Sequence, residues 1–100
     1  MYSREQILDF LAKNKKYLQQ EFHITKIGLF GSFSRNEQSD KSDIDIVLEF
    51  EEDTPNLFEI KQALRNYFKD KLNVKADICR EKYIKPIFRE RILNEAIYVE

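Results

Sequence analysis

The sequence is poor in the residues that mark secreted, membrane-bound and linker-rich proteins. It holds one cysteine, which excludes an internal disulfide, so we expect a reducing compartment, the cytoplasm. Two glycines and two prolines leave no flexible linker. Charged residues interrupt the apolar residues near the start, unlike a signal peptide, and no apolar stretch approaches the roughly 20 residues that span a bilayer. We expect no membrane contact.

The sequence also lacks an excess of one charge. Lysine and arginine total 17, aspartate and glutamate total 18, and the formal net charge is -1. Because nucleic-acid binding usually shows as a basic surplus, a nucleic-acid partner is not expected. Hydrophobic residues make up 42% of the 100 residues, enough to fold rather than remain disordered. We expect one domain, residues 1–100, with one modest core.

Apolar periodicity divides the chain into alternating helices and strands. It predicts helices over residues 3–22, 55–72 and 85–94, with a short helix or tight turn over 32–38. It predicts strands over residues 24–30, 43–50 and 73–79, and a short edge strand over 96–99. This order is typical of a small α/β (α+β) sheet packed by helices. Periodicity leaves it open whether that sheet is parallel or mixed.

Local signals fix some of these boundaries. Ser3 with Gln6 three residues later forms a capping-box signature, and Thr54 before Pro55 predicts an N-cap followed by proline in the first helical turn. Four aromatic residues at helical spacing are expected in the core, namely Phe10, Phe22, Phe58 and Phe68.

One motif stands out between the first two predicted strands. Gly31 and Ser32 follow an apolar run, and Asp43-x-Asp45 begins the next strand after ten intervening residues. Strand alternation turns Asp43 and Asp45 to the same face, about 7 Å apart along the chain, with Ile44 on the other face. Two carboxylates at that separation can converge on a divalent metal ion.

The chemistry of phosphate transfer calls for such a pair. Magnesium usually takes one or two protein carboxylates and fills its other positions with water and substrate phosphate. Where two ions act together, about 3.5–4 Å apart, a third carboxylate is useful as a ligand or as a proton acceptor. Asp77 is the candidate, because it lies in the middle of the third predicted strand, where aspartate is disfavoured.

The first half of the motif suits phosphate. Ser32 and the backbone N–H groups that follow it could hold phosphate oxygens, and Gly31 allows close approach because it has no Cβ. Arg35, three residues beyond Ser32, could reach the same oxygens with its planar fork.

Together these residues resemble the signature of the polymerase-β-type nucleotidyltransferase superfamily. The chain length and the ending Asn-Glu-Ala-Ile-Tyr-Val-Glu are similar to its smallest members, the minimal nucleotidyltransferases (MNT-domain antitoxins) encoded beside HEPN-domain ribonuclease toxins. The resemblance implies a polymerase-β-like fold with a small mixed sheet.

The resemblance also implies roles for the motif. Asp43, Asp45 and Asp77 would bind two Mg²⁺ ions and carry catalysis, with Gly31 and Ser32 as phosphate contacts. It further implies ATP as donor and a tyrosine of the partner toxin as acceptor, so that AMP transfer silences the toxin.

One residue departs from the family pattern. Asn36 follows Arg35 where the family often has glycine, and asparagine tolerates the left-handed backbone that such a turn needs. The departure leaves the role of Arg35 open.

Simpler interpretations stand beside each assignment. Asp43 and Asp45 could be solvated residues at a strand start, Asp77 an exposed edge-strand residue, and Gly31-Ser32 an ordinary turn. Arg35 could be a surface arginine. His23 and the lone Cys79 fit structural roles better than catalytic ones. Five basic residues after the third strand form either a solvated face or a surface for triphosphate or an acidic partner: Arg80, Lys82, Lys85, Arg89 and Arg91.

The sequence therefore predicts an Mg²⁺-dependent nucleotidyltransferase that moves AMP from ATP to a hydroxyl of a partner toxin. Two rivals stay open. One is a non-catalytic antitoxin that neutralises its partner by forming a complex. The other is the same chemistry on a small molecule or an RNA end.

Overall fold

The computed structural model describes residues 2–100. Their order confirms the predicted alternation, with the first helix divided in two. The elements are α1 (Arg4–Lys13), α2 (Lys15–Phe22), β1 (Ile24–Phe30), α3 (Gly31–Ser34), β2 (Ile44–Phe50), α4 (Leu57–Leu72), β3 (Ala76–Arg80), the 3-10 turn η1 (Glu81–Tyr83), α5 (Pro86–Glu95) and β4 (Ile97–Tyr98).

The four strands form one mixed sheet in the order β3-β2-β1-β4. β1 runs antiparallel to both β2 and β4, whereas β2 and β3 are parallel. A parallel pair needs a crossover, and the sixteen residues of α4 supply it. The sheet is therefore mixed, as the family resemblance implied.

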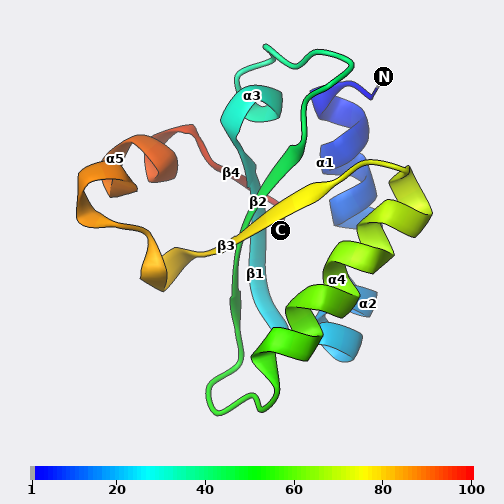
Figure 1. Ribbon diagram of the computed structural model, residues 1–100, viewed down its shortest axis with the longest axis vertical. Helices are drawn as coiled ribbons and strands as arrows, with labels where there is room; N and C mark the ends of the chain where they lie inside the picture. Colours follow the sequence, from blue (N-terminus) through cyan, green and yellow to red (C-terminus); the bar gives the residue numbers. More distant parts are fainter. Residues whose placement is uncertain (1) are drawn as a thin grey trace.

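The core lies between one face of the sheet and the helices α1, α2 and α4, which Figure 1 shows together to the right of the strands. Every second residue of β2 points into it: Ile44, Ile46 and Leu48 are completely buried. Leu11, Leu64 and Phe68 meet them from the helices. This confirms the predicted alternation, and leaves the opposite face of β2 to Asp45, Val47 and Glu49.

That opposite face has less cover. α5 lies to the left of the strands in Figure 1, apart from the other helices. β4 pairs with β1 at its edge, where Gly28 is opposite Tyr98. A Cβ on Gly28 would lie 3.0 Å from the Ile97 carbonyl oxygen and 3.0 Å from the Tyr98 ring, so glycine permits this close pairing.

Local chemistry confirms one predicted helix boundary and corrects two. The capping box of Ser3 and Gln6 is present. The first helix breaks at Asn14, because its side-chain amide donates to the Phe10 carbonyl at 2.8 Å and competes with the helix backbone. α4 begins at Leu57 rather than residue 55, because the Thr54 hydroxyl donates within the preceding turn, to the Glu51 carbonyl at 2.6 Å.

One predicted core residue is not in the core. Phe58 is 77% exposed, because it lies in the first turn of α4 on the side away from the sheet. Its helical spacing was right, but α4 packs through Leu64 and Phe68 further along. Within residues 2–100, no helix combines the length and apolar character needed to cross a membrane.

Candidate active site

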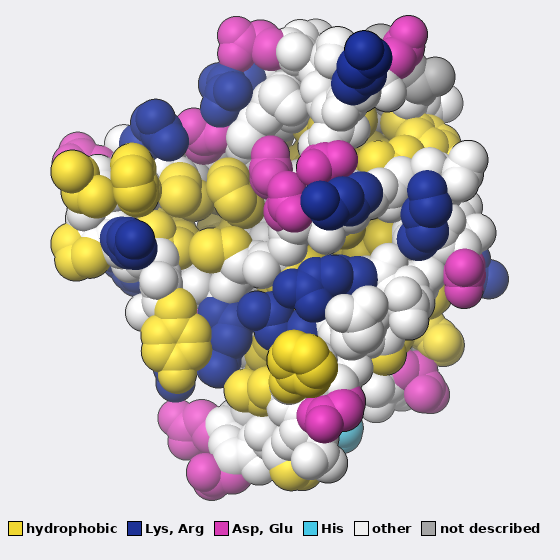
Figure 2. Space-filling model, in the orientation of Figure 1, with side chains coloured by type: hydrophobic (Ala, Val, Ile, Leu, Met, Phe, Trp, Pro, Cys, Tyr) yellow, Lys and Arg dark blue, Asp and Glu magenta, His cyan; other side chains and the backbone are white. Residues whose placement is uncertain are grey.

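The fold brings the predicted aspartates together at one end of the sheet. Asp45 and Asp77 are register partners on the parallel strands β2 and β3, so their side chains point to the same face. Asp43 precedes β2 by one residue and shares that face by alternation. Figure 2 shows acidic side chains gathered near the middle of this side of the molecule. Asp45 and Asp77 are 32 residues apart in the sequence, and the α4 crossover between β2 and β3 brings them side by side.

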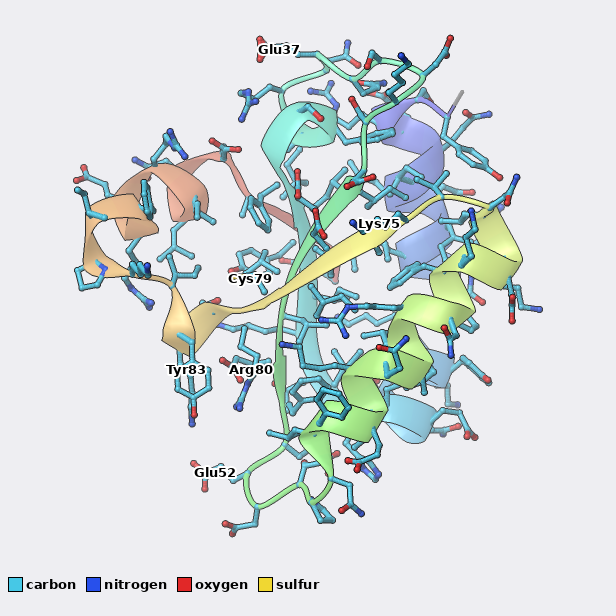
Figure 3. The ribbon with its side chains drawn as sticks, in the orientation of Figure 1. Glu37, Glu52, Lys75, Cys79, Arg80 and Tyr83 are labelled. Carbon is cyan, nitrogen blue, oxygen red and sulfur yellow. The ribbon has the colours of Figure 1, made fainter. Side chains whose placement is uncertain are left out.

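The three carboxylates differ in exposure. Asp43 and Asp45 are half-buried, whereas Asp77 is exposed. β3 is an edge strand, so the simpler interpretation of Asp77 as an edge residue agrees with its exposure. Its place opposite Asp45 agrees with the site interpretation. Lys75, the residue before β3 (labelled in Figure 3), has its Nζ 4.0 Å from Asp43 Oδ2.

The pKa of Asp45 reflects its burial and the negative charges beside it. Burial raises its pKa from the ordinary 3.8 to about 6, and the negative charges of Asp77 and Asp43 add to the rise. Arg35 opposes it. Carboxylates crowded in this way favour either a proton or a cation between them.

The three aspartates offer carboxylate oxygens, the donor type that Mg²⁺ prefers. Across residues 2–100, no three His, Cys, Asp or Glu side chains converge tightly enough to enclose a metal ion by themselves. Mg²⁺ rarely needs such a cage, because it is usually held by one or two carboxylates together with water and substrate phosphate. The residues present therefore fit that ion in the company of a phosphate substrate.

Gly31 connects the two halves of the motif. Phe30, the last residue of β1, is the register partner of Asp45, so the turn that follows lies against that aspartate. Gly31 has a φ of +75, and a Cβ there would lie 2.1 Å from Asp45 Oδ2. Only glycine both adopts this left-handed backbone readily and has no Cβ to clash with Asp45. Gly31 therefore allows the turn after β1 and also leaves room for the Asp45 carboxylate beside it.

The remaining motif residues form a tight turn. α3 has four residues, and Ser34 holds it closed by donating from its hydroxyl to the Gly31 carbonyl at 2.8 Å. Ser32 is half-buried, and its carbonyl accepts from the Glu37 N–H at 2.8 Å. Asn36 adopts a φ of 60, which confirms that asparagine takes the left-handed position expected of it.

Arg35 does not point freely at solvent. Its Nη1 donates to Glu95 Oε2 at 2.8 Å and its Nε to Glu37 Oε1 at 2.7 Å. The same Glu95 oxygen accepts from the Gly31 N–H at 2.7 Å. A carboxylate from α5 therefore lies on two of the groups that were expected to face phosphate.

Sequence reasoning missed Glu95. It belongs to the chain ending used for the family resemblance, but it has no fixed spacing to the motif and lies 64 residues from Gly31. An acidic residue at the end of a predicted helix is ordinary on a surface. Only the packing of α5 beside α3 brings its side chain, 15% exposed, to this place.

Two other candidates take structural positions. His23 ends α2 in a left-handed conformation, at the opposite end of β1 from Gly31. Cys79 is half-buried, and burial raises the pKa of its thiol, which disfavours a reactive thiolate.

A cavity of about 700 Å³ opens beside Asp43. Asp43 and Lys75 contribute polar groups to its wall, and Phe33 and Val74 contribute apolar surface. Asp45 and Asp77 lie outside this wall. The cavity therefore meets the acidic face of the sheet at Asp43.

Comparison with known proteins decides the family. A nucleotidyltransferase domain model matches residues 11–99. The chain belongs to the nucleotidyltransferase domain family. The match confirms the resemblance that the motif indicated. It places the protein in a class of enzymes that transfer nucleotidyl groups.

Individual relatives agree in length as well as sequence. MJ0128 of Methanocaldococcus jannaschii, which carries a protein adenylyltransferase name, is 40% identical over 100 residues, covering 99% of this chain and 100% of its own. Protein adenylyltransferase MntA of Thermococcus cleftensis is 33% identical over 99 residues, covering 99% and 98%.

Solved structures agree in fold. A minimal nucleotidyltransferase matches with a TM-score of 0.77 and 27% identity, over 96% of this chain and 95% of its own. A toxin-antitoxin crystallised with AMP-PNP matches with a TM-score of 0.68 and 19% identity, over 87% of this chain and 70% of that chain. At 19% identity, the second match shows a similar fold and nothing more.

Proposed function

We propose that this nucleotidyltransferase moves AMP from ATP to a hydroxyl group of a partner toxin, with Mg²⁺, and thereby acts as its antitoxin. The observation that carries the proposal is the meeting of Asp43, Asp45 and Asp77 on one sheet face, against the Gly31 turn. The protein adenylyltransferase names of the relatives and the toxin-antitoxin neighbour support the donor and the kind of partner.

Each side chain has a distinct task in this proposal. Asp43 and Asp45 hold Mg²⁺, which when bound offsets the charge of the triphosphate. Gly31 and Ser32 present backbone N–H groups to the phosphate oxygens, and Arg35 adds its guanidinium. Asp77, the most exposed of the three acids, accepts the proton of the attacking hydroxyl.

The reaction balances with these parts. The acceptor oxygen forms a bond to the α-phosphorus of ATP, the bond from that phosphorus to the bridging oxygen breaks, and pyrophosphate leaves with both bond electrons. We further propose a tyrosine of a HEPN-family ribonuclease as the acceptor, on the strength of the family resemblance. A phenol oxygen suits the role because it ionises more readily than the hydroxyl of serine or threonine.

The proposal is tested by incubating the protein with ATP, Mg²⁺ and the proposed HEPN-family toxin partner. Mass spectrometry should find AMP on a toxin tyrosine. Asp43→Asn, Asp45→Asn and Asp77→Asn should each lose most of the transfer. Asp70→Asn, an exposed acid of α4 that lies outside the cavity, should keep it.

Two outcomes would overturn parts of this account. If the wild-type protein blocks toxicity while no AMP is found on the toxin, neutralisation by complex formation replaces catalysis. If Asp77→Asn turns over like the wild type, Asp77 has no place in the site.

A further inference from the structure

Helix α5 leaves two of its apolar side chains, Ile87 and Phe88, exposed and the others only partly covered. None of its ten residues is buried, although it contains Ile87, Phe88, Ile92 and Leu93. Ile87 is 82% exposed and Phe88 is 44% exposed. Ten residues are too few for a stable isolated helix in water, and helices of this length normally gain stability by packing an apolar face.

The exposed apolar area continues into η1. Tyr83 is 67% exposed and points away from the molecule in Figure 3. The Arg80 guanidinium lies 4.8 Å from its ring centre, which fixes the ring from one side. Figure 2 shows hydrophobic side chains along this whole side, over α5 and the segment before it.

Basic residues flank these apolar ones. Lys82, Lys85 and Arg91 have no carboxylate within ion-pair distance anywhere in the described part of the chain. Arg89 is instead engaged by Glu81, through the carbonyl at 2.8 Å and the carboxylate at 3.9 Å. Glu90 is the acid of α5 that lies exposed beside them. The margin of the patch therefore carries a net positive charge.

We call this patch the α5 surface: Tyr83, Ile87 and Phe88, with Lys82, Lys85 and Arg91 at its margin. It ends next to the site, because Glu95 in the last turn of α5 contacts Gly31 and Arg35. A helix rises 1.5 Å per residue, so Ile87 lies about 12 Å from Glu95 along the axis. A protein seated on the α5 surface could reach the aspartates with one loop.

We propose that the α5 surface is the docking site for the acceptor protein of the reaction above, and so this inference rests on the proposed function. A partner protein that fits the α5 surface has a contact face with an apolar centre and an acidic margin. Such a partner covers Ile87, Phe88 and Tyr83, and its carboxylates pair with the three free cations. Docking beside the site would also bring the partner's acceptor hydroxyl close to the aspartates.

The test measures binding of the same HEPN-family toxin, separately from catalysis. Ile87→Ser with Phe88→Ser should weaken the complex at least 10-fold by titration calorimetry, because exposed apolar anchors carry much of an interface. Lys85→Glu with Arg91→Glu should slow association and reduce its dependence on salt. Binding of AMP-PNP with Mg²⁺ should stay within twofold of wild type in both variants.

Phe58→Ser is the matched control. Phe58 is similarly exposed, at 77%, but it lies on α4, which packs on the other face of the sheet. Toxin affinity within twofold of wild type in the Ile87/Phe88 variant would overturn the docking proposal. So would sedimentation showing that α5 joins two copies of this chain while the toxin binds elsewhere. If the toxin binds through α5 but receives no AMP, the proposed function fails and the docking site stands.

Discussion

The backbone N–H of Gly31 donates to the carboxylate of Glu95 across 64 residues of sequence, at 2.7 Å. Glu95 Oε2 also accepts from Arg35, so a side-chain anion lies where a phosphate oxygen was expected. An incoming triphosphate must share these donors with Glu95 or displace it. In the proposed function, we therefore expect this contact to lower the affinity of the site for nucleotide.

Removing the negative charge of Glu95 should therefore favour nucleotide binding. Glu95→Gln keeps the size of the side chain, and we expect AMP-PNP to bind about 3- to 10-fold tighter, because a charged hydrogen bond exceeds a neutral one by about 1 kcal/mol. Titration calorimetry with Mg²⁺ measures it, with Glu90→Gln on the exposed side of α5 as control. Weaker binding would show that Glu95 supports the phosphate groups rather than competing with them.

Gly31 should not accept any side chain. Gly31→Ala combines an unfavourable left-handed backbone with a Cβ that would lie 2.1 Å from Asp45 Oδ2. We expect at least about 2 kcal/mol less stability, together with loss of transfer because Asp45 must move. Chemical denaturation measures the first effect and an AMP-transfer assay the second. Ser32→Ala is the neighbouring control for stability alone, because Ser32 belongs to the proposed phosphate site. Near-wild-type stability of Gly31→Ala would contradict the contact.

When no metal is bound, the ionised side chain of Asp45 should lower the free energy of unfolding. Its pKa is raised to about 6, chiefly by burial, so the ionised form is disfavoured in the folded protein. A shift of this size corresponds to about 3 kcal/mol, and solvent around the half-buried side chain reduces it to about 1–2 kcal/mol. Asp45→Asn should raise the free energy of unfolding by that amount at pH 7.5.

The sign of the pH dependence follows from the raised pKa. Because the folded protein binds the proton more readily than the unfolded chain, wild-type stability gains from this group as the pH falls from about 7 to about 4. The advantage of Asp45→Asn should therefore shrink towards zero at pH 4. Denaturation with EDTA present measures both proteins, with Asp40→Asn as control. An advantage that grows on acidification would contradict the assignment.

The ion pair of Glu49 and Arg80 should hold the lower part of the open sheet face together. Arg80 donates to Glu49 Oε2 from Nη2 at 2.9 Å and from Nε at 3.2 Å, and the Lys82 N–H donates to Oε1 at 2.8 Å. The pair joins β2 to β3 and η1. Both side chains are largely buried, at 15% and 12% exposure.

Losing this acceptor leaves a cation partly buried without its partner. We expect Glu49→Ala to lower the free energy of unfolding by about 2–3 kcal/mol. Burial tends to raise the pKa of Glu49, but the hydrogen bonds from Lys82 and Arg80 outweigh it and lower the value. The stabilisation is therefore present at neutral pH and lost as the pH falls through the acid range. Glu5→Ala, in an exposed pair, should change stability by less than about 0.5 kcal/mol.

The sequence predicted the parts of the fold that local chemistry dictates. The alternation of β2 followed from Ile44, Ile46 and Leu48, and the capping box of α1 from Ser3 and Gln6. The family resemblance, rather than periodicity, predicted the mixed sheet. Asp43, Asp45 and Asp77 were singled out by residue type and position, and the parallel pairing of β2 with β3 then brought Asp45 beside Asp77.

What the sequence did not predict depends on packing or on competing hydrogen bonds. The break at Asn14 and the late start of α4 reflect side-chain bonds that compete with helix caps. Phe58 has helical spacing yet lies outside the core. Glu95 reaches Gly31 only because α5 packs beside α3, and no spacing in the sequence records that contact.

The position of the label in ATP tests the central claim most directly. The protein, the partner toxin proposed above and Mg²⁺ are incubated with ATP labelled at either the α- or the γ-phosphorus. Nucleotidyl transfer predicts that the α-label enters the toxin, that the γ-label leaves in pyrophosphate, and that Asp43→Asn abolishes both. Entry of the γ-label into the toxin, or α-label transfer undiminished in Asp43→Asn, would contradict the account.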